Sequence, residues 1–362
     1  MVRLLLALGL LCWDSAATAG ARAEIPLTEA TPQSQGLDGA RLQQAVDGIA
    51  AGDYGRIDAL LVLRNDFIVL ERYFSPLYRG PDYRYPVRSV TKSITSALVG
   101  IARGQGKLPA LQTGLRELFP QYSSIANLDT RKRAVTFEHL LSMTAGFAWD
   151  ELSPGAMSDS AMVSSPDWIK HVLDLPMHDL PGERLVYNSG CSMLLSDILL
   201  RGTGMAVDEF AARYLFEPIG IDNWRWSLGK NNVINTAYGL SMTRRDMARF
   251  GTLYLNRGNW RGRQVVPEDW VGLSTATRVL GSGENYPYAY AYQWWRLQDG
   301  EPTAAMLATN DLYTALGMGG QFITVIPHLD MVVVSTAENY APANEELLLK
   351  LLRDHIIPAV SR

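Results

Sequence analysis

A serine and a lysine stand three residues apart in the segment Ser89-Val90-Thr91-Lys92. The segment is predicted to open a helix, because the apolar residues that follow recur at helical spacing: Ile94, Ala97, Leu98 and Ile101. Residues three apart share a helix face, which puts the lysine amine beside the serine hydroxyl. Such a pair can act as nucleophile and base on the carbonyl carbon of an ester or amide. The free N–H groups at the start of the helix favour the oxyanion that this chemistry forms.

A lysine base has to be neutral. Lowering its pKa from about 10.4 to near 7 costs roughly 4–5 kcal/mol of desolvation or like-charge repulsion. We therefore expect Lys92 to be buried, with few acids nearby. The structural alternative is that Ser89 caps the helix and Lys92 is solvated.

The same spacing occurs a second time, in Ser227-Leu228-Gly229-Lys230. This copy contains a glycine and is followed by two asparagines, so it is predicted to be a loop. We interpret Ser227 as a structural residue. The repeat also shows that Ser-x-x-Lys alone is a weak signal, and that its meaning depends on context.

Residues 136–146 and 240–251 supply part of that context. With the Ser89 pair, they make the chain similar to the serine β-lactamase and penicillin-recognising enzyme superfamily over most of its length. Within it, the chain resembles the branch of class C-like β-lactamases, family VIII esterases and 6-aminohexanoate-dimer hydrolases. The resemblance implies a β-lactamase/transpeptidase-like fold and catalysis through an acyl-serine. Neither of the two segments need itself be catalytic.

The second motif of that superfamily is Tyr-x-Asn, and the corresponding stretch here is Tyr187-Asn188-Ser189. The resemblance implies that Tyr187 faces Ser89 and Lys92 and passes a proton to the leaving group. Ser189 replaces the usual asparagine; its hydroxyl can replace one amide contact to lysine or substrate, but not both a donor and an acceptor held in a plane. The alternative is that Tyr187 is a core tyrosine with a satisfied hydroxyl.

The third motif is Lys or His, then Thr, then Gly, and residues 315–321 stand in its place here. The resemblance implies that the backbone N–H groups of Met318 and Ser89 form the oxyanion hole. It also implies that the segment binds substrate, together with Ser189, through Ala315, Gly317, Gly319 and Gln321. The alternative for these glycines is a β-bulge without a ligand.

Ala315 stands where the superfamily carries a cation. A β-lactam or peptide carboxylate normally pairs with such a cation, so β-lactamase activity is not favoured. The form of this segment looks more like the 6-aminohexanoate-dimer hydrolase and esterase branches, which cleave small or linear amides and esters. Six aromatic residues could line a cleft for them: Tyr83, Tyr85, Trp149, Trp168, Trp294 and Trp295.

Strand patterns occur near both ends of the chain. Residues 60–70 are predicted to form a hairpin, and residues 288–296, 321–326 and 331–335 are predicted to be strands. A helix is predicted after Asp38, with its end at Gly52, and another over residues 344–357.

These elements predict an α+β fold, with an antiparallel sheet flanked by the N- and C-terminal helices and a mostly helical insertion beside it. The predicted sheet domain is discontinuous, over residues 24–88 and 285–362, and the helical domain spans residues 89–284. A cleft is expected between the two domains.

Composition excludes several classes of function. The 362 residues carry 33 basic and 37 acidic side chains, a net charge of −4, without a basic block, so nucleic-acid binding is not expected. Two cysteines and five histidines without His-Glu-x-x-His spacing give no metal motif. No Gly-x-Ser-x-Gly, Walker or Gly-x-Gly-x-x-Gly context occurs, so neither a cofactor nor a metal is predicted.

Residues 1–23 have the pattern of a signal peptide. Arg3 precedes an apolar run over residues 4–11, and Ala21-Arg22-Ala23 offers small residues for a cleavage point before Glu24. The run breaks at Asp14, too early for a membrane span. We expect an exported protein, periplasmic or secreted, without a stable membrane anchor.

The sequence therefore predicts an exported serine hydrolase that cleaves small or linear esters or amides. One alternative is a DD-peptidase or class C-like β-lactamase. A second is a non-catalytic relative that binds cell-wall peptide, which would have no need of a nucleophile with its base. No feature of the sequence specifies an oligomeric state.

Overall fold

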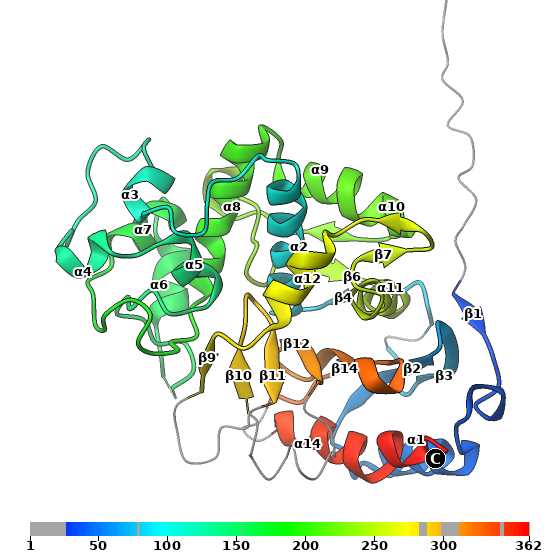
Figure 1. The fold of residues 1–362 in the computed structure, drawn as a ribbon. Coiled ribbons are helices and arrows are strands. Elements are labelled where there is room, and N and C mark those ends of the chain that lie inside the picture. Colours follow the sequence, from blue (N-terminus) through cyan, green and yellow to red (C-terminus); the bar gives the residue numbers. More distant parts are fainter. Residues whose placement is uncertain are drawn as a thin grey trace, which may run out of the picture.

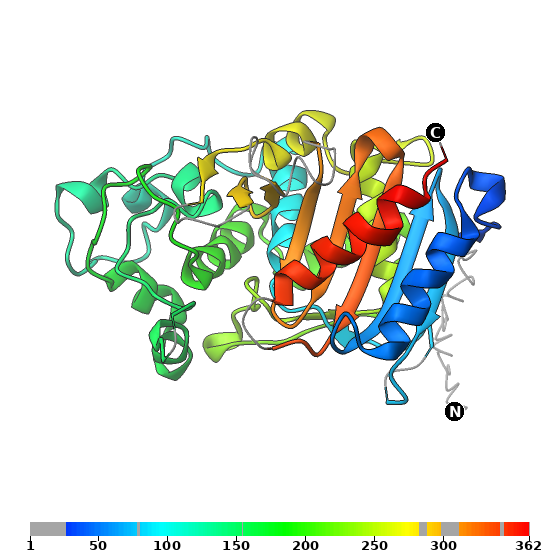
Figure 2. The ribbon, with the colours of Figure 1, turned by 90° about the horizontal axis from the view of Figure 1, so that it is seen from below.

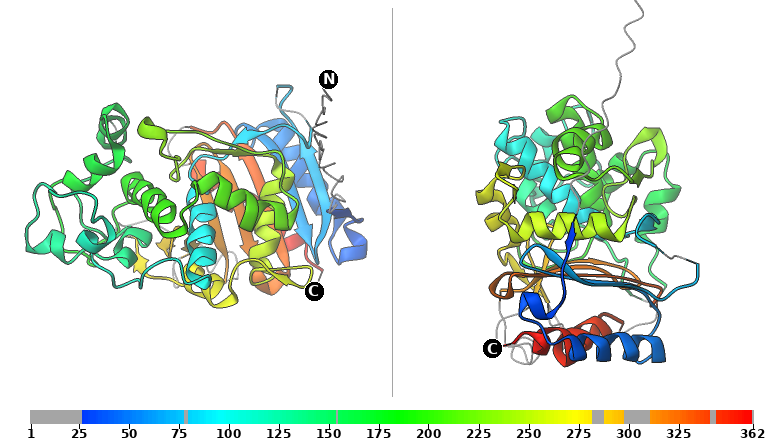
Figure 3. Two further views of the ribbon diagram at one scale, coloured as in Figure 1. Left: turned by 90° about the horizontal axis from the view of Figure 1, so that it is seen from above. Right: turned by 90° about the vertical axis from the view of Figure 1, so that its right-hand side faces the viewer.

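The chain is arranged in three layers, with a sheet between two sets of helices (Figures 1 and 3). The computed structural model describes residues 27–77, 80–153, 155–281, 288–297, 311–340 and 344–361. The predicted signal peptide lies outside these residues. The α+β class and the flanked, mostly antiparallel sheet are confirmed.

The central sheet joins both ends of the chain. Its order over the described residues is β1-β3-β2-β14-β13-β12-β11-β10-β9. All its pairs are antiparallel except the parallel pair of β1 and β3. The strands are β1 (Thr28–Glu29), β2 (Ile57–Arg64), β3 (Phe67–Tyr73), β9 (Val279–Leu280), β10 (Tyr288–Tyr290), β11 (Trp295–Leu297), β12 (Tyr313–Gly317), β13 (Gln321–Ile326) and β14 (Met331–Ala337). The pairing of β14 with β2 confirms that distant segments build one sheet.

The predicted hairpin is β2 and β3. Asn65 and Asp66 form its two-residue turn, with φ of 50° and 64°, as a tight hairpin requires. Every residue of β2 before Arg64 is buried, because layers cover both faces of the sheet.

Helices α1 (Gly39–Ala51) and α14 (Asn344–Leu351) lie across one face of the sheet (Figure 2). Asp38 caps α1 by accepting the backbone N–H of Ala40 at 2.8 Å, and Gly52 ends it with φ of 88°, both as predicted. A π-helical turn (Leu352–Ile356) and a 3-10 turn (Ile357–Ala359) continue the chain beyond α14.

The other face of the sheet carries α2 (Val90–Gly104) and α11 (Arg244–Leu255), and α8 (Ser189–Thr203) packs on α2 (Figure 1). Gly251 lets α11 lie close to the sheet, because a Cβ there would come within 2.5 Å of Val332. Helix α2 is almost wholly buried, so its first turn is held rigidly.

Residues 288–296, predicted as one strand, form two strands with a turn between β10 and β11. Gln293 adopts φ of 65° in this turn. Its carbonyl accepts the Ser93 hydroxyl at 2.6 Å, and its side-chain oxygen accepts the Ser192 hydroxyl at 2.6 Å. These bonds to α2 and α8 hold the left-handed turn, and no local pattern indicates them.

The remaining elements form the helical region and two small sheets. The short helices are α3 (Leu115–Leu118), α4 (Thr130–Arg133), α5 (Phe137–Leu141), α6 (Ser158–Ser164), α7 (Trp168–Asp174), α9 (Val207–Ala211), α10 (Glu217–Ile219) and α12 (Glu268–Thr275). The small sheets are β4 (Tyr85–Pro86), β6 (Leu240–Met242) and β5 (Arg225–Trp226), and β7 (Asn259–Trp260) with β8 (Arg263–Gln264). Both α11 and β9 precede residue 284 and yet pack on or belong to the central sheet. The predicted domain boundary near residue 284 stays a prediction.

Candidate active site

Ser89 lies at the N-terminus of α2, as predicted. It is partly exposed, and it immediately precedes the first helical residue. Arg88, just before it, adopts φ of 52°, the left-handed region that non-glycine residues rarely occupy. Such strain is often stored at functional sites. The serine is thus presented at a sharp entry into a rigid, buried helix.

Lys92 lies one turn further along α2, with its Nζ 3.1 Å from Ser89 Oγ. The side chain is 1% exposed. Two further oxygens among the described residues accept from Nζ: Ser189 Oγ at 3.1 Å and the Ala237 carbonyl at 3.0 Å. The predicted pair therefore forms, and a solvated Lys92 is excluded.

Burial lowers the pKa of Lys92 to about 8, while the carboxylates of Glu151 and Asp159 act in the opposite direction. The expected burial is present. The expected scarcity of acids is wrong, because two carboxylates lie near enough to raise the pKa. Desolvation is the larger effect, so a useful fraction of Lys92 is neutral near physiological pH.

Tyr187 lies beside Lys92, whose Nζ is 4.9 Å from the centroid of the phenol ring. It directly precedes Asn188, which caps α8 by accepting the N–H of Cys191 at 3.1 Å. The ring stacks on Trp295 of β11 at 5.4 Å between centroids. The packing of α8 on α2, together with β11, thus brings Tyr187 to the Ser89 pair.

Ser189 lies beside Lys92 and has a second partner. Its hydroxyl donates to Glu151 Oε1 at 2.8 Å, and its backbone N–H donates to Glu151 Oε2 at 2.7 Å. The indole N–H of Trp149 reaches the same Oε2 at 2.6 Å. Sequence reasoning missed Glu151, because it lies in an irregular loop 38 residues from Ser189 and no spacing signals the contact.

A second tyrosine, Tyr238, follows the carbonyl that binds Lys92. Its ring centroid is 5.9 Å from Lys92 Nζ. Its hydroxyl donates to Asp159 at 3.0 Å, and burial together with that carboxylate raises the pKa of the phenol. Tyr238 is therefore held as a hydrogen-bond donor to Asp159, so Tyr187 remains the candidate for the predicted proton shuttle.

The glycine-rich third motif forms the turn between β12 and β13. Gly317 pairs with Gln321 in regular register, so the segment is a hairpin turn and the alternative of a bulge is not observed. Gly319 adopts φ of 89°. A Cβ on Gly317 would lie 2.4 Å from the Val87 carbonyl, so only glycine lets β12 approach the strand that leads into Ser89.

Met318 lies in this turn with a 60% exposed side chain, and the close approach at Gly317 brings the turn to the start of α2. Ala315 and Gln321 are fully buried. The Gln321 amide donates to the Ala337 carbonyl at 2.7 Å and to the Met318 carbonyl at 3.2 Å. Gln321 thus supports the turn from the interior, and a direct contact of its side chain or of Ala315 with substrate stays a prediction.

The predicted aromatic residues divide between site and core. Trp149 and Trp295 contact site residues, whereas Trp294 is wholly buried against Phe250. Ser227 lies in an exposed loop, as expected for a structural residue.

Cys191 lies in α8, two residues after Ser189. Its thiol is buried, and burial raises its pKa far above the ordinary value. A protonated, inaccessible thiol is a poor nucleophile, which agrees with a structural role.

Two further features of the described part of the chain bear on function. Within it, no cluster of three or more His, Cys, Asp or Glu side chains is suited to hold a metal ion. None of the helices in those residues is long and apolar enough to cross a membrane.

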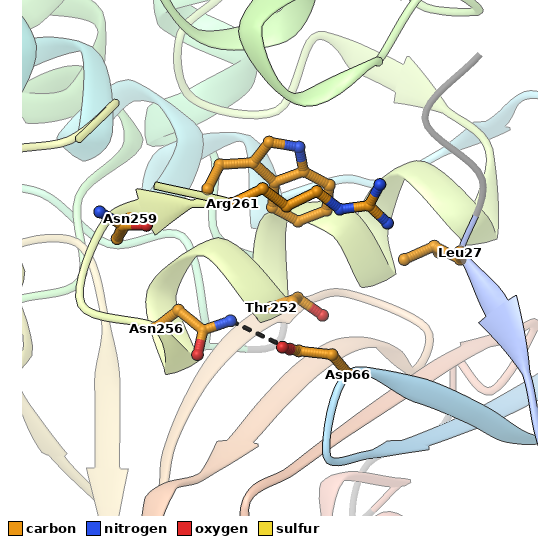
Figure 4. A pocket seen from close by; sticks show the side chains of 7 residues that line it. Leu27, Asp66, Thr252, Asn256, Asn259 and Arg261 are labelled. Carbon is orange, nitrogen blue, oxygen red and sulfur yellow. Dashed lines mark hydrogen bonds between the residues drawn. The ribbon is translucent and has the colours of Figure 1, made fainter. Parts of the chain in front are cut away.

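A cavity of about 320 Å³ lies at the end of α11, between the β2–β3 turn and the β7–β8 hairpin (Figure 4). Asn256 donates to Asp66 at 3.0 Å across its floor. Its other lining residues are Leu27, Thr252, Asn259, Trp260 and Arg261. Ser89, Lys92 and Tyr187 are not among them, so the cavity is separate from the candidate site.

The fold is that of the class that contains β-lactamases and penicillin-binding proteins. The family model described as Beta-lactamase matches residues 41–354. The chain therefore belongs to the β-lactamase family, a family of hydrolases.

Individual relatives are more distant. The chain is 24% identical over 300 residues to the 6-aminohexanoate-dimer hydrolase of Paenarthrobacter ureafaciens, covering 76% of this chain and 71% of that protein. A solved Bacillus anthracis protein assigned as a 6-aminohexanoate-dimer hydrolase superposes with a TM-score of 0.73 at 20% identity, covering 93% and 89% of the two chains. EstCE1, a hydrolase with promiscuous acyltransferase activity, superposes with a TM-score of 0.70 at 16% identity, covering 89% and 99%. At these identities the structural matches establish the fold.

Proposed function

We propose that the protein is a serine hydrolase that cleaves small or linear esters or amides through an acyl-serine intermediate. The observation that carries the proposal is the buried Lys92 amine, 3.1 Å from the Ser89 hydroxyl, with its pKa lowered to about 8. Burying a lysine in this way costs stability, and groups with such perturbed pKa values are concentrated at functional sites.

In the first half-reaction, neutral Lys92 takes the hydroxyl proton of Ser89 as Oγ attacks the carbonyl carbon. The tetrahedral oxyanion faces the backbone N–H groups of Ser89 and Met318. As the intermediate collapses, Tyr187 delivers a proton to the departing alcohol or amine and is reprotonated from Lys92. The products of this half are the leaving group and acyl-Ser89.

In the second half-reaction, water attacks the acyl carbonyl and gives a proton to Lys92. Ser89 Oγ then leaves as the free hydroxyl after regaining a proton, and the carboxylic acid is released. Atoms and charges balance over the cycle without a cofactor, because each proton taken by Lys92 is returned to a leaving oxygen or nitrogen.

Small or linear esters and amides are favoured over β-lactams by the charge of the site. Ala315 supplies no cation at the third motif, and the carboxylates of Glu151 and Asp159 near Lys92 would repel a substrate carboxylate held beside the scissile bond, as in a β-lactam. The names of the two similar proteins described as 6-aminohexanoate-dimer hydrolases, and the description of EstCE1 as a hydrolase, also support linear amides or esters as substrates. A DD-peptidase or β-lactamase is the second candidate, favoured by the family match.

The test is turnover of p-nitrophenyl esters, linear ω-amino amides and nitrocefin by the wild type, Ser89→Ala and Ser227→Ala. Ser227→Ala is a matched control, because it alters the other Ser-x-x-Lys segment in an exposed loop. We expect Ser89→Ala to lose roughly 10³-fold or more, and Ser227→Ala to match the wild type. Full turnover of every substrate by Ser89→Ala would contradict the proposed acyl-serine mechanism.

The panel also separates the rivals. Faster turnover of nitrocefin than of any ester or amide would favour the β-lactamase alternative, whereas acylation by a fluorescent penicillin that is released only slowly would favour the DD-peptidase alternative. Binding of cell-wall peptide without turnover of any substrate would favour the non-catalytic alternative.

We also propose that the protein is exported after cleavage near Ala23, which the pattern of residues 1–23 supports. The mass of the protein recovered from a periplasmic or culture fraction tests this. A recovered chain that still carries residues 1–23 would contradict it.

A further inference from the structure

The Glu151 carboxylate binds three donors among the described residues. Oε2 accepts two N–H groups, from the Ser189 backbone at 2.7 Å and from the Trp149 indole at 2.6 Å. Oε1 accepts the Ser189 hydroxyl at 2.8 Å. A carboxylate can only accept, so the single hydrogen of the Ser189 hydroxyl is committed to Glu151.

This commitment fixes what Ser189 can offer to Lys92. With its hydrogen on Glu151, Ser189 Oγ can only accept from Lys92 Nζ, 3.1 Å away. The Ala237 carbonyl, 3.0 Å from Nζ, is likewise only an acceptor. A neutral lysine has two N–H hydrogens and one lone pair. The two acceptors take both hydrogens, and the lone pair is left for the Ser89 hydroxyl.

We propose that Glu151 is a positioning residue: by holding the Ser189 hydroxyl as an acceptor, it aims the lone pair of Lys92 at Ser89. This inference rests on the proposed role of Lys92 as the base. Were the Ser189 hydroxyl reversed, it would donate to the lone pair and occupy the base. Glu151 touches neither substrate nor nucleophile in this scheme and acts through Ser189.

Glu151→Gln is a sharp probe because the geometry decides which way the amide turns. Two N–H donors face the Oε2 position, so the amide oxygen takes that place. The amide NH₂ then faces Ser189 Oγ and donates to it. The Ser189 hydrogen is turned toward Lys92, which reverses the arrangement proposed for the wild type.

The charge of Glu151 gives a second readout. Among the described residues, the carboxylates of Glu151 and Asp159 and the phenols of Tyr187 and Tyr238 lie near Lys92. Cys191, on the helix α8 that packs against α2, carries a protonated thiol. Glu151 raises the pKa of Lys92, so its neutralisation lowers that pKa. The rising limb of kcat/KM against pH should therefore move to lower pH in Glu151→Gln, even though its plateau falls.

The experiment measures kcat, KM and the pH profile on the best p-nitrophenyl ester. For Glu151→Gln we expect kcat to fall roughly 10- to 100-fold, with KM within about threefold and the limb at lower pH. In a Ser189→Ala background the same change should cost less than about threefold in kcat, because no hydroxyl remains to be misdirected. Trp149→Phe is the matched control, because it removes one hydrogen bond to Glu151 but leaves the charge of Glu151 and both of its hydrogen bonds to Ser189. The rising limb of kcat/KM against pH should not move in Trp149→Phe.

Glu151→Asp keeps the charge and guards against a folding defect. The rising limb of its kcat/KM against pH should match that of the wild type, and its kcat should be higher than that of Glu151→Gln. The proposal would be overturned if Glu151→Gln and Glu151→Asp lost equal amounts of kcat and had the same rising limb of kcat/KM against pH. A kcat for Glu151→Gln within twofold of the wild type would also overturn it. So would losses in kcat from Glu151→Gln and Ser189→Ala that are fully additive in the double variant. These outcomes leave the proposed function standing, whereas an active Ser89→Ala protein would remove it.

Discussion

At the scale of single residues, the site depends on a lysine that is wholly buried yet partly neutral. Its first-turn position beside Ser89 follows from the i, i+3 spacing, and Tyr187 follows from the second motif. The contact from Glu151 to Ser189 does not follow from any spacing, because a loop carries it across the site. The sequence thus predicted that Ser89, Lys92 and Tyr187 lie together, but not that Glu151 contacts Ser189.

Lys92 makes a specific prediction for the pH dependence of kcat/KM. Its pKa is lowered to about 8 by burial, and the base is the neutral form, so activity should rise with pH through about 8 and level off above it. At pH 7 about a tenth of the lysine is neutral. A rising limb centred near the ordinary lysine value, close to 10.4, would contradict this account of the base.

Tyr187→Phe removes the phenol hydroxyl and keeps the ring that stacks on Trp295. We expect kcat on an amide to fall about 10²-fold, since a positioned acid–base group contributes at least that much. Thermal unfolding should be nearly unchanged. Tyr238→Phe is the control, because that hydroxyl is bonded to Asp159. Equal losses in the two variants would argue against a proton shuttle at Tyr187.

At the scale of elements, caps and turns with local signals were predicted well. Asp38, Gly52 and the β2–β3 turn occur where expected, because each depends on residues a few positions away. The turn at Gln293 was missed, since its bonds reach α2 and α8. Tertiary hydrogen bonds thus overrode a continuous strand pattern.

The close approach of β12 to the entry of α2 makes Gly317 a test of how elements build the oxyanion hole. In Gly317→Ala the Cβ would meet the Val87 carbonyl at 2.4 Å, so the strand must shift. We expect a loss of roughly 1–3 kcal/mol in the free energy of unfolding.

We also expect at least a tenfold fall in kcat in Gly317→Ala, because each oxyanion donor contributes roughly 2.7–4 kcal/mol. Gly272→Ala in α12 is the control, since a Cβ there meets nothing within 4 Å. Wild-type turnover by Gly317→Ala would show that this approach does not matter for catalysis.

At the scale of the whole molecule, one sheet built from both ends of the chain supports a buried helix whose first turn carries the proposed nucleophile and base. The split arrangement could be predicted from strand patterns at both ends. The position of α11 and β9 within the sheet region could not, because short edge strands and helix faces give little signal about their partners.

Burial of Lys92 also predicts how the stability of the whole molecule depends on pH. Its pKa is lowered in the folded state, so between about pH 8 and 10.5 the unfolded chain holds a proton that the folded chain does not. This contribution to stability is full above the unfolded pKa and is lost as pH falls to about 8. The difference is about 3 kcal/mol.

Urea unfolding of the wild type and Lys92→Met at several pH values isolates this contribution, because other groups cancel in the difference. The stability of the wild type relative to Lys92→Met should increase over the window from pH 8 to 10.5. A difference that stays constant across it would mean that Lys92 titrates normally in the folded protein.

The central claim is that Ser89 carries the acyl group. The most direct measurement is peptide mass mapping after acid quench of a reaction with an activated p-nitrophenyl ester. We predict one acyl adduct, on the peptide that contains Ser89, and its loss in Ser89→Ala but not in Ser227→Ala. An adduct on another residue, or equal labelling of Ser89→Ala, would contradict the account.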